Sequence, residues 1–425
     1  MHVDQKLKMT GLAWYGWLLV GLLALSSLSS KALGAAWLVL VLVGLHRLLA
    51  SYRFWPSASR VPSWPLIWLG ACAVALALKS AATIYWQDPW PERHGEIRML
   101  FGALAVWGWC HFLPPEPGQF KKLCVWLSHA LTLTALLGLC WVLYFDRTKV
   151  TTHPIPWAGI MAVFSCWLLA MGLNRLFSQK ERMLWLAGSF IAMLAVLASQ
   201  SRGAFVLVPW WGMVAGWVAW RSFRRGSTVA VPALRRMGIA AGLLVLVLTV
   251  LAFTPVLERP RTAIMHAIEE TQRSRQNAAN ESNSSFGARL YMWQRSVEAL
   301  QQNPWSGYGH DGRKALIKQW ADDAESTTIS ELGHVHNEYL HQWIDHGVLG
   351  LTSVLAYVLG LLAVTIQLFR LGHATAGLAL AGTWVMYVVG NLSNVNFAHN
   401  YYTAGLSLMT SLIMVLMTRL ESSAS

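Results

Sequence analysis

Long apolar runs recur along the chain, and each is close to the roughly 20 residues that a helix needs to cross a bilayer. Lipid offers no hydrogen-bond partner to an unpaired peptide group, so runs of this kind are expected to form helices and not strands. The pattern therefore predicts an all-α integral membrane protein with about twelve transmembrane helices. The expected spans are residues 12–28, 32–50, 64–85, 96–113, 120–145, 154–177, 181–200, 204–221, 233–254, 343–369, 373–391 and 401–418.

A single long polar segment, residues 255–342, interrupts the apolar pattern. Loops of such length are uncommon unless they are functional or disordered. Helical spacing of apolar residues returns within the segment at 261–275, 287–302 and 311–323. The run from Pro304 to Gly309 is expected to end the second of these helices in a turn. We therefore divide the chain into helices one to nine (1–254), one large outward-facing loop region (255–342), and helices ten to twelve with a short tail (343–425).

Composition supports a membrane protein and argues against nucleic-acid binding. Charged residues make up 12% of the chain, about half the usual share in a soluble domain. The formal net charge of +13 comes mainly from basic residues beside the ends of the expected spans, where anionic lipid headgroups attract them. With the N-terminus inside, seventeen of these residues fall on the cytoplasmic side and five in the short outer loops. Both termini are therefore expected in the cytoplasm.

Two arginines are candidate phosphate ligands, because a guanidinium fork suits that geometry. Arg202 lies in a tight outer link between two spans, where it could reach lipid phosphate or bind an anion beside a helix N-terminus. Arg289 lies four residues before Trp293 and shares a helix face with it. Arg289 is either a solvated residue or a second anion clamp. The expected apolar stripe of this helix is Leu290, Trp293, Val297 and Leu300, and Arg295 and Arg313 are expected at the surface.

A cluster of imidazoles lies at the end of the loop region. His336 could be a structural histidine at a helix end, a metal ligand or a general base. As a base it would rely on Asn337 to cap or orient the segment and on Glu338 to hold the other ring nitrogen. The pattern alone leaves these alternatives open. A metal site would draw on His334, His336, His341 and His346, whose intervals match no metalloprotease or deaminase pattern.

Two further cations and one polar run lie near the same outer side. Lys79 and Arg98 fall near the outer ends of the third and fourth spans, where a charge either reaches the interface or marks a ligand path. Residues 391–396, with His399 and Asn400, could line the same cavity or form a simple loop.

Several short motifs together resemble the O-antigen ligase and O-antigen polymerase superfamily of bacterial envelope enzymes. Each motif is weak alone, but their order, spacing and side of the membrane are specific, and the resemblance covers roughly residues 180–360. The motifs are Ser201-Arg202-Gly203-Ala204, Arg289-x-x-x-Trp293, Pro304-x-x-Gly307-x-Gly309, His336-Asn337-x-Tyr339-Leu340 and Gly347-x-x-Gly350.

The resemblance implies a C-type glycosyltransferase architecture in the bacterial inner membrane, with a periplasmic active site. It implies that His336 is the catalytic base and that Arg202 and Arg289 bind the pyrophosphate of the donor. Within the superfamily, the chain is most similar to the ligases, which transfer O-antigen glycan from undecaprenyl pyrophosphate to a sugar hydroxyl of lipid A–core. The expected partners are therefore this lipid-linked donor, the lipid A–core acceptor and the surrounding membrane lipids. Further substrate-binding candidates are Trp293, Asn337, Tyr339, Lys79 and Arg98.

No cofactor or metal is expected, because a lipid pyrophosphate is a good leaving group and two arginines can neutralise its developing charge. A single base suggests direct attack with inversion at the anomeric carbon. One alternative is an O-antigen polymerase that acts on the same carrier lipid. Another, of a different class, is a transporter of lipid-linked glycan. The absence of an evident internal repeat and the small number of intramembrane charges disfavour the transporter.

Overall fold

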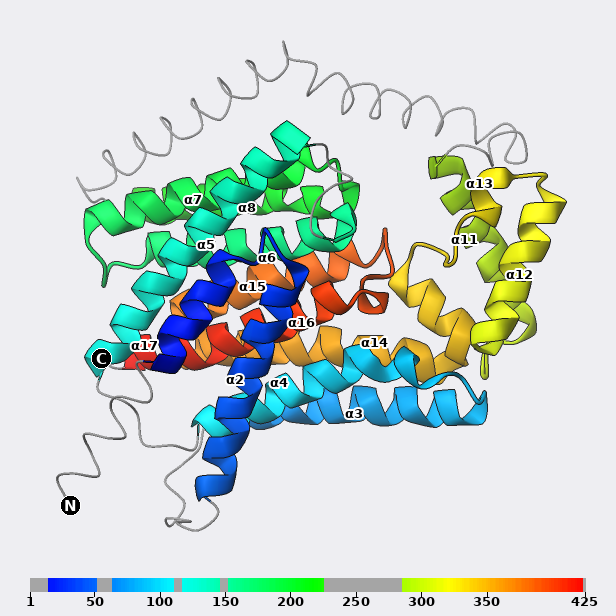
Figure 1. Cartoon of the computed structure of the whole chain (residues 1–425), viewed down its shortest axis with the longest axis horizontal. Coiled ribbons are helices and arrows are strands. Elements are labelled where there is room, and N and C mark those ends of the chain that lie inside the picture. Colours follow the sequence, from blue (N-terminus) through cyan, green and yellow to red (C-terminus); the bar gives the residue numbers. More distant parts are fainter. Residues whose placement is uncertain (1–13, 52–62, 111–116, 146–151, 225–284, 423–425) are drawn as a thin grey trace.

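The structure is a computed structural model that describes residues 14–51, 63–110, 117–145, 152–224 and 285–422. These residues are mostly helical and contain no β-strand. Figure 1 shows a bundle of long helices with a smaller group of helices at one end, which we call the outer end. The bundle contains a helix at Trp14–Ala24, α2 (Ser30–Ser51), α3 (Trp64–Tyr85), α4 (His94–Cys110), α5 (Pro117–Phe145), α6 (Pro154–Leu173), α7 (Gln179–Ala198), α8 (Leu207–Arg224), α14 (Glu338–Arg370), α15 (Ala374–Gly390) and α16 (Asn400–Leu412). The smaller group contains α11 (Ser285–Gln302), α12 (Gly309–Asp323) and α13 (Thr327–Ser330).

Eight of the described helices are long and apolar enough to cross a membrane. Each expected span within the described ranges coincides with a helix, whereas the expected span 233–254 and the expected helix 261–275 lie outside them. The helix Trp14–Ala24 is short, and α4 and α15 have 17 residues each, fewer than the roughly 20 of a complete span. The expectation of about twelve spans is therefore supported only in part.

Helices α6 and α16 form the centre of the bundle. Within their apolar windows, 89% of the residues of Pro154–Leu173 and 94% of those of Asn400–Ser422 are buried. Helices buried to this extent are surrounded by other helices of the bundle and not by lipid. Figure 1 agrees, with α6, α15 and α16 between α7 and α8 on one side and α2, α3 and α4 on the other.

Small residues bring α2 and α4 into close contact. A Cβ atom added at Gly44 would lie 2.6 Å from the Cα of Ala105, and one added at Gly108 would lie 2.3 Å from the carbonyl oxygen of Gly44. Backbones can approach this closely only where side chains are missing, which is how helices commonly pack in lipid. This contact holds α4, and with it Arg98, against the bundle.

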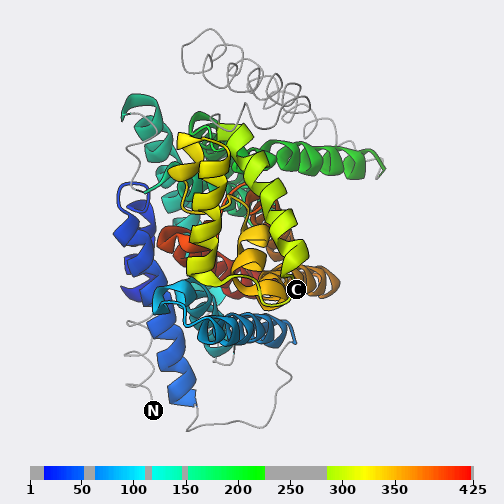
Figure 2. The same cartoon turned by 90° about the vertical axis from the view of Figure 1, so that its right-hand side faces the viewer.

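Helices α11, α12 and α13 enclose a small core of their own at the outer end. The expected stripe on α11 is partly wrong, because Val297 is 49% exposed whereas Leu300 is 4% exposed. The buried face instead runs through Ala288, Met292 and Ala299, which face the apolar residues of α12 and α13. Figure 2 looks onto this end and shows the yellow-green and yellow helices in front of the bundle.

Helix α14 is interrupted near its start, at His346 and Gly347. Their φ/ψ angles are −128°/16° and 59°/−147°, outside the helical region. The turn after α11 fits into this break: Tyr308 N donates to Ile344 O at 2.7 Å, and Val348 N donates to Trp305 O at 3.1 Å. The expected turn is confirmed, and it satisfies backbone groups that the break would otherwise leave unpaired. The first part of α14, Glu338–His346, is therefore a separate short helix at the outer end.

Candidate functional site

His336 stands in a strained backbone conformation directly before α14. Its φ of 53° places a non-glycine residue in the left-handed region, which costs of order 1–3 kcal/mol and is concentrated at functional sites. The residue is only 6% exposed, and neither ring nitrogen makes a hydrogen bond of ordinary geometry with the described residues, although the side chain of Asn394 lies close to the ring. A buried imidazole with both nitrogens unused is unusual for a purely structural histidine, because such histidines normally bond their surroundings.

Contacts on both sides hold the His336 segment in place. On the N-terminal side, Trp293 Nε1 of α11 donates to the carbonyl oxygen of the buried Val335 at 2.8 Å. On the C-terminal side, Asn337 caps α14, because its Oδ1 accepts from Tyr339 N at 3.0 Å and from the following amide at 3.2 Å. The expected capping role of Asn337 is confirmed, and Trp293 contributes by fixing the backbone.

Arg202, Arg289, His334 and His336 form one group, which we call the arginine–imidazole cluster. Burial and the charge of Arg202 lower the pKa of Arg289, so the two guanidinium groups lie close enough to repel each other. Neither has a carboxylate partner in the part of the chain that the structure describes. Arg202, in the 3-10 turn η4 (Arg202–Val206), is exposed, and Arg289 is half-buried. Neighbouring cations without an acidic partner favour the binding of an anion.

The same cluster keeps both imidazoles neutral. Burial lowers the pKa of His336 to about 3, and the charges of His334 and Arg289 add to this effect, opposed by the neighbouring Asn394 side chain. Burial also lowers the pKa of His334 to about 4, with contributions from His399 and Arg313. The two rings lie 4.4 Å apart between their centroids. At neutral pH His336 is therefore unprotonated, and its pKa would have to rise on substrate binding for it to act as an effective base.

Glu338 does not hold the ring of His336, contrary to the expectation from the sequence. Its carboxylate is fully buried and accepts from Gln342 Nε2 at 2.9 Å and from Phe397 N at 3.0 Å. Its backbone N donates to Asn391 O at 2.8 Å. Glu338 therefore ties the start of α14 to the polar run 391–396.

The polar run 391–396 is an ordered part of the site and not a simple loop. Asn396 Nδ2 donates to Asn391 Oδ1 at 2.8 Å, and Asn394 Nδ2 donates to Asn396 Oδ1 at 2.9 Å. A Cβ atom at Gly203 would lie 2.0 Å from Ser393 Oγ. The missing side chain of Gly203 thus makes room for this run beside Arg202.

Three further candidates make contacts within the protein. Lys79 is 1% exposed; its Nζ donates to Gln342 Oε1 at 2.6 Å and lies 3.2 Å from His346 Nδ1. Arg98 Nη1 donates to Asn400 Oδ1 at 2.8 Å. The hydroxyl of Tyr339 donates to a backbone carbonyl of α15 at 3.1 Å. Their substrate-binding roles remain predictions, and the contacts of Lys79 favour a positioning role.

Arg313 was expected at the surface, and this expectation is wrong. Its side chain is 4% exposed, and its Nε donates to Asp345 Oδ1 at 2.6 Å. Its Nη1 donates to the carbonyl oxygen of Gly333, directly before the imidazoles, and its Nη2 lies 3.1 Å from His310 Nδ1. The sequence signal that could have revealed this is the spacing of the polar residues after Glu338, because positions three and four apart share one helix face. Those residues are His341, Gln342, Asp345 and His346, all buried.

A second buried pair joins the short helix to the link between α3 and α4. Asp88 Oδ2 lies 2.6 Å from His346 Nε2, and Asp88 Oδ1 accepts from His310 N at 3.0 Å. Burial raises the pKa of Asp88, but its bonds with the two histidines outweigh this effect and lower the pKa overall. The sequence analysis did not single out Asp88.

Among the described residues, the group that could best hold a metal ion does not include His336. Ligand atoms of Glu92, His310 and Asp345 lie within 4.8 Å of one another. The guanidinium group of Arg313 already bonds Asp345 and lies against His310. A cation would therefore have to displace a cation, so these residues fit an ion-pair network better than a metal centre.

Comparison with known proteins matches residues 187–355 to the family described as O-Antigen ligase. A protein of Haemophilus influenzae described as an uncharacterized protein is 32% identical over 81 residues, which cover 19% of this chain and 20% of that protein. The eight long apolar helices among the described residues indicate a multi-pass membrane protein, and the matched segment overlaps several of them. The arginine–imidazole cluster lies inside the matched residues, and over residues 187–355 the chain is similar to the O-antigen ligase family.

Proposed function

We propose that the protein is an O-antigen ligase that transfers glycan from undecaprenyl pyrophosphate to a sugar hydroxyl of lipid A–core. The observation that carries the proposal is the arginine–imidazole cluster. Two arginines without a carboxylate partner among the described residues lie beside an imidazole whose nitrogens both lack a hydrogen bond of ordinary geometry. An anion site next to a neutral base suits the transfer of a sugar from a phosphate leaving group to a hydroxyl.

In the proposed reaction, the acceptor hydroxyl oxygen attacks the anomeric carbon of the donor sugar. The bond between that carbon and the pyrophosphate oxygen breaks, and undecaprenyl pyrophosphate leaves with the electron pair. His336 takes the proton of the hydroxyl as the new bond forms. A single displacement of this kind inverts the anomeric carbon.

Arg202 and Arg289 would bind the pyrophosphate and neutralise the charge that grows on the leaving oxygen. Such groups act most strongly when they are held in place before the reaction, because no reorganisation is then needed. Arg289 is held by α11, which Trp293 anchors to the His336 segment. The donor and the base would therefore be positioned by one unit of structure, and the step requires no metal.

The test is glycan transfer by the purified full-length chain in lipid nanodiscs, with lipid-linked donor and lipid A–core acceptor and a chelator present. His336→Ala is expected to lower the rate by about 10²- to 10⁴-fold, the usual contribution of a general base. His373→Ala is the control, because His373 precedes α15, away from the cluster. Near-normal transfer by His336→Ala would contradict the assignment, and loss of wild-type activity with chelator would revive the metal interpretation.

A deletion strain separates ligase from polymerase. Loss of a ligase leaves polymerised glycan on the carrier lipid, whereas loss of a polymerase leaves single repeats attached to lipid A–core. The expected result is lipopolysaccharide without attached glycan and with accumulated carrier-linked polymer. A pattern of single repeats on the core would assign the chain to the polymerase instead.

A further inference from the structure

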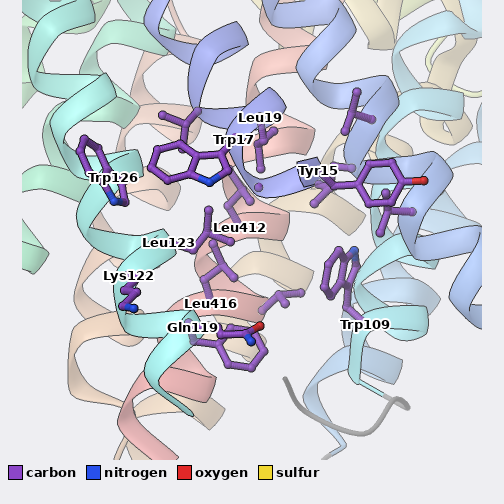
Figure 3. Close-up of a pocket in the computed structure, with 17 residues that line it drawn as sticks. Tyr15, Trp17, Leu19, Trp109, Gln119, Lys122, Leu123, Trp126, Leu412 and Leu416 are labelled. Carbon is purple, nitrogen blue, oxygen red and sulfur yellow. The ribbon is translucent and has the colours of Figure 1, made fainter. Parts of the chain in front are cut away.

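A cavity of about 370 Å³ lies at the end of the bundle opposite the arginine–imidazole cluster. Its lining residues Leu412 and Leu416 lie at and just beyond the end of α16, whereas that helix begins at Asn400, next to the polar run 391–396 beside the cluster. The cavity opens between the helix Trp14–Ala24, α2, α5 and the end of α16, as Figure 3 shows. It lies within the 300–1,000 Å³ typical of small-molecule sites. The lining residues that bear on its chemistry are Trp17, Trp109, Gln119, Lys122, Trp126 and Leu416.

The lining is apolar and aromatic, with a rim that is open to the side. Trp17 and Trp126 lie 5.0 Å apart between ring centroids, and they are 54% and 46% exposed. Leu412 and Leu416 are almost completely buried behind this rim. In a membrane-spanning bundle, a sideways-open apolar cavity meets the hydrocarbon of the bilayer, so its natural occupant is an acyl chain. The paired tryptophans suit the interface, where such rings concentrate.

The described residues that line the cavity include a lysine and no acidic residue. Lys122 and Gln119 line the cavity directly, and Lys122 is exposed. The guanidinium group of Arg47 lies 4.2 Å from the ring centroid of Trp109, a lining residue. Arg419 Nη2 donates to Cys110 O at 3.0 Å, one residue beyond Trp109. Basic pockets between transmembrane helices are suited to anionic lipid headgroups.

An irregular helix turn forms the back wall. The segment η6 (Ile413–Met417) is a π-helical turn that directly continues α16, and its Val415 and Leu416 line the cavity. Such turns are rare and occur often at functional sites. This observation is independent of the charge at the rim. The π-helical turn and the basic rim together indicate a binding site at this end of the bundle and not ordinary lipid-facing surface.

We propose that this cavity binds one acyl chain of an anionic glycerophospholipid, with the phosphate of the headgroup beside Lys122. The site is separate from the arginine–imidazole cluster and does not depend on the proposed transfer reaction. Its ligand is a bulk lipid of the leaflet at this end, which the distribution of basic residues predicts to be cytoplasmic.

The experiment measures lipid retained by the purified full-length chain, using dioleoyl-phosphatidylglycerol and dioleoyl-phosphatidylcholine as probes. Native mass spectrometry after detergent exchange is expected to show about one tightly held phosphatidylglycerol and a higher melting temperature in its presence. Lys122→Glu is expected to weaken retention at least about fivefold, because one basic residue near a lipid headgroup contributes about that factor. Leu416→Trp is expected to abolish retention by filling the cavity.

Lys121→Glu is the matched control. It makes the same charge change one residue away, but Lys121 lies 5.6 Å from the ring centroid of Phe177 and does not line the cavity. Retention should remain near that of the unchanged protein. Equal retention of both lipids, equal weakening by Lys121→Glu and Lys122→Glu, or full retention by a folded Leu416→Trp variant would each overturn the proposal.

Discussion

The outer end holds two kinds of arginine, and they differ in their partners. Arg202 and Arg289 repel each other and have no carboxylate partner among the described residues, and their side chains are exposed or half-buried. Arg313 is almost completely buried and is bound by Asp345, His310 and the carbonyl of Gly333. A buried charge is tolerated only when it is paired, whereas a partly exposed charge can stay unpaired until a ligand arrives. The first pair therefore suits ligand binding, and Arg313 suits support of the imidazole segment.

Removing Arg313 should have the largest effect on stability. Arg313→Met leaves Asp345 buried without its partner, which typically costs about 3–5 kcal/mol. The measurement is thermal unfolding in detergent. Arg295→Met is the control, because Arg295 pairs with Glu298 and Asp323 at the surface and is 32% exposed; its loss should cost only about 0–1 kcal/mol.

The double variant Arg313→Met with Asp345→Leu tests the reason for that loss. Replacing both members of a buried pair by apolar residues of similar volume is often neutral. Most of the stability should therefore return. A double variant as unstable as Arg313→Met would show that the contacts to Gly333 and His310, and not the ion pair, carry the effect.

Removing Arg289 should reduce activity and leave stability unchanged, the opposite of what we expect for Arg313. Arg289→Ala is expected to lower glycan transfer by about 10²- to 10³-fold, as loss of one preorganised group does, with an unchanged melting temperature. Inorganic pyrophosphate should inhibit this variant less than the unchanged protein. Arg295→Ala, on the same helix, should transfer normally. If Arg289→Ala were less stable but transferred glycan normally, Arg289 would have a structural role like that of Arg313.

The pH dependence of kcat and that of kcat/KM report the pKa of His336 in the substrate-bound and in the free protein, respectively. The pKa of His336 is about 3 in the free protein, partly because of the charge of Arg289. A bound pyrophosphate would neutralise that charge, so the pKa should rise in the complex. The acidic limb of kcat should therefore lie at higher pH than the acidic limb of kcat/KM. The reverse order would contradict binding of the anion at Arg289.

Stability has a pH dependence of its own at this cluster. The pKa values of His334 and His336, about 4 and about 3, lie below the roughly 6.5 of an unfolded histidine. Their neutral rings therefore contribute stability that is complete above about pH 6.5 and is lost as the pH falls towards 4 and then 3. Thermal unfolding between pH 7 and pH 4 measures this, and His336→Gln should reduce the dependence.

The smallest effect is expected at the cap of the short helix. Asn337→Ala should cost about 1 kcal/mol, and Asn337→Asp should retain most of the stability, because aspartate caps as well as asparagine. Transfer activity of the two variants decides the role of the amide. If Asn337→Asp is stable but inactive, Asn337 contacts the substrate; if it is active, Asn337 acts only as a cap.

The apolar pattern predicted most helices well, because helices in lipid need long apolar runs and offer no other way to satisfy the backbone. The motifs around Arg202, Arg289 and His336 also located the cluster. The pattern failed where partners come from distant segments. Nothing local distinguishes Arg313 from Arg295, yet one meets a buried carboxylate 32 residues later and the other meets surface carboxylates. Hydrophobic spacing likewise could not choose the buried face of α11, because that choice depends on where α12 and α13 lie.

The break in α14 has a consequence for how the membrane part of this protein can change. In a continuous helix, one inserted residue rotates everything beyond it by about 100°. Here the non-helical His346 and Gly347 separate Glu338–His346 from the membrane-spanning remainder, and the turn at Trp305 and Tyr308 pins the backbone on both sides. Because the same turn bonds Ile344 before the break and Val348 after it, the direction of the short helix is set by the turn at Trp305 and Tyr308 as well as by the membrane-spanning helix.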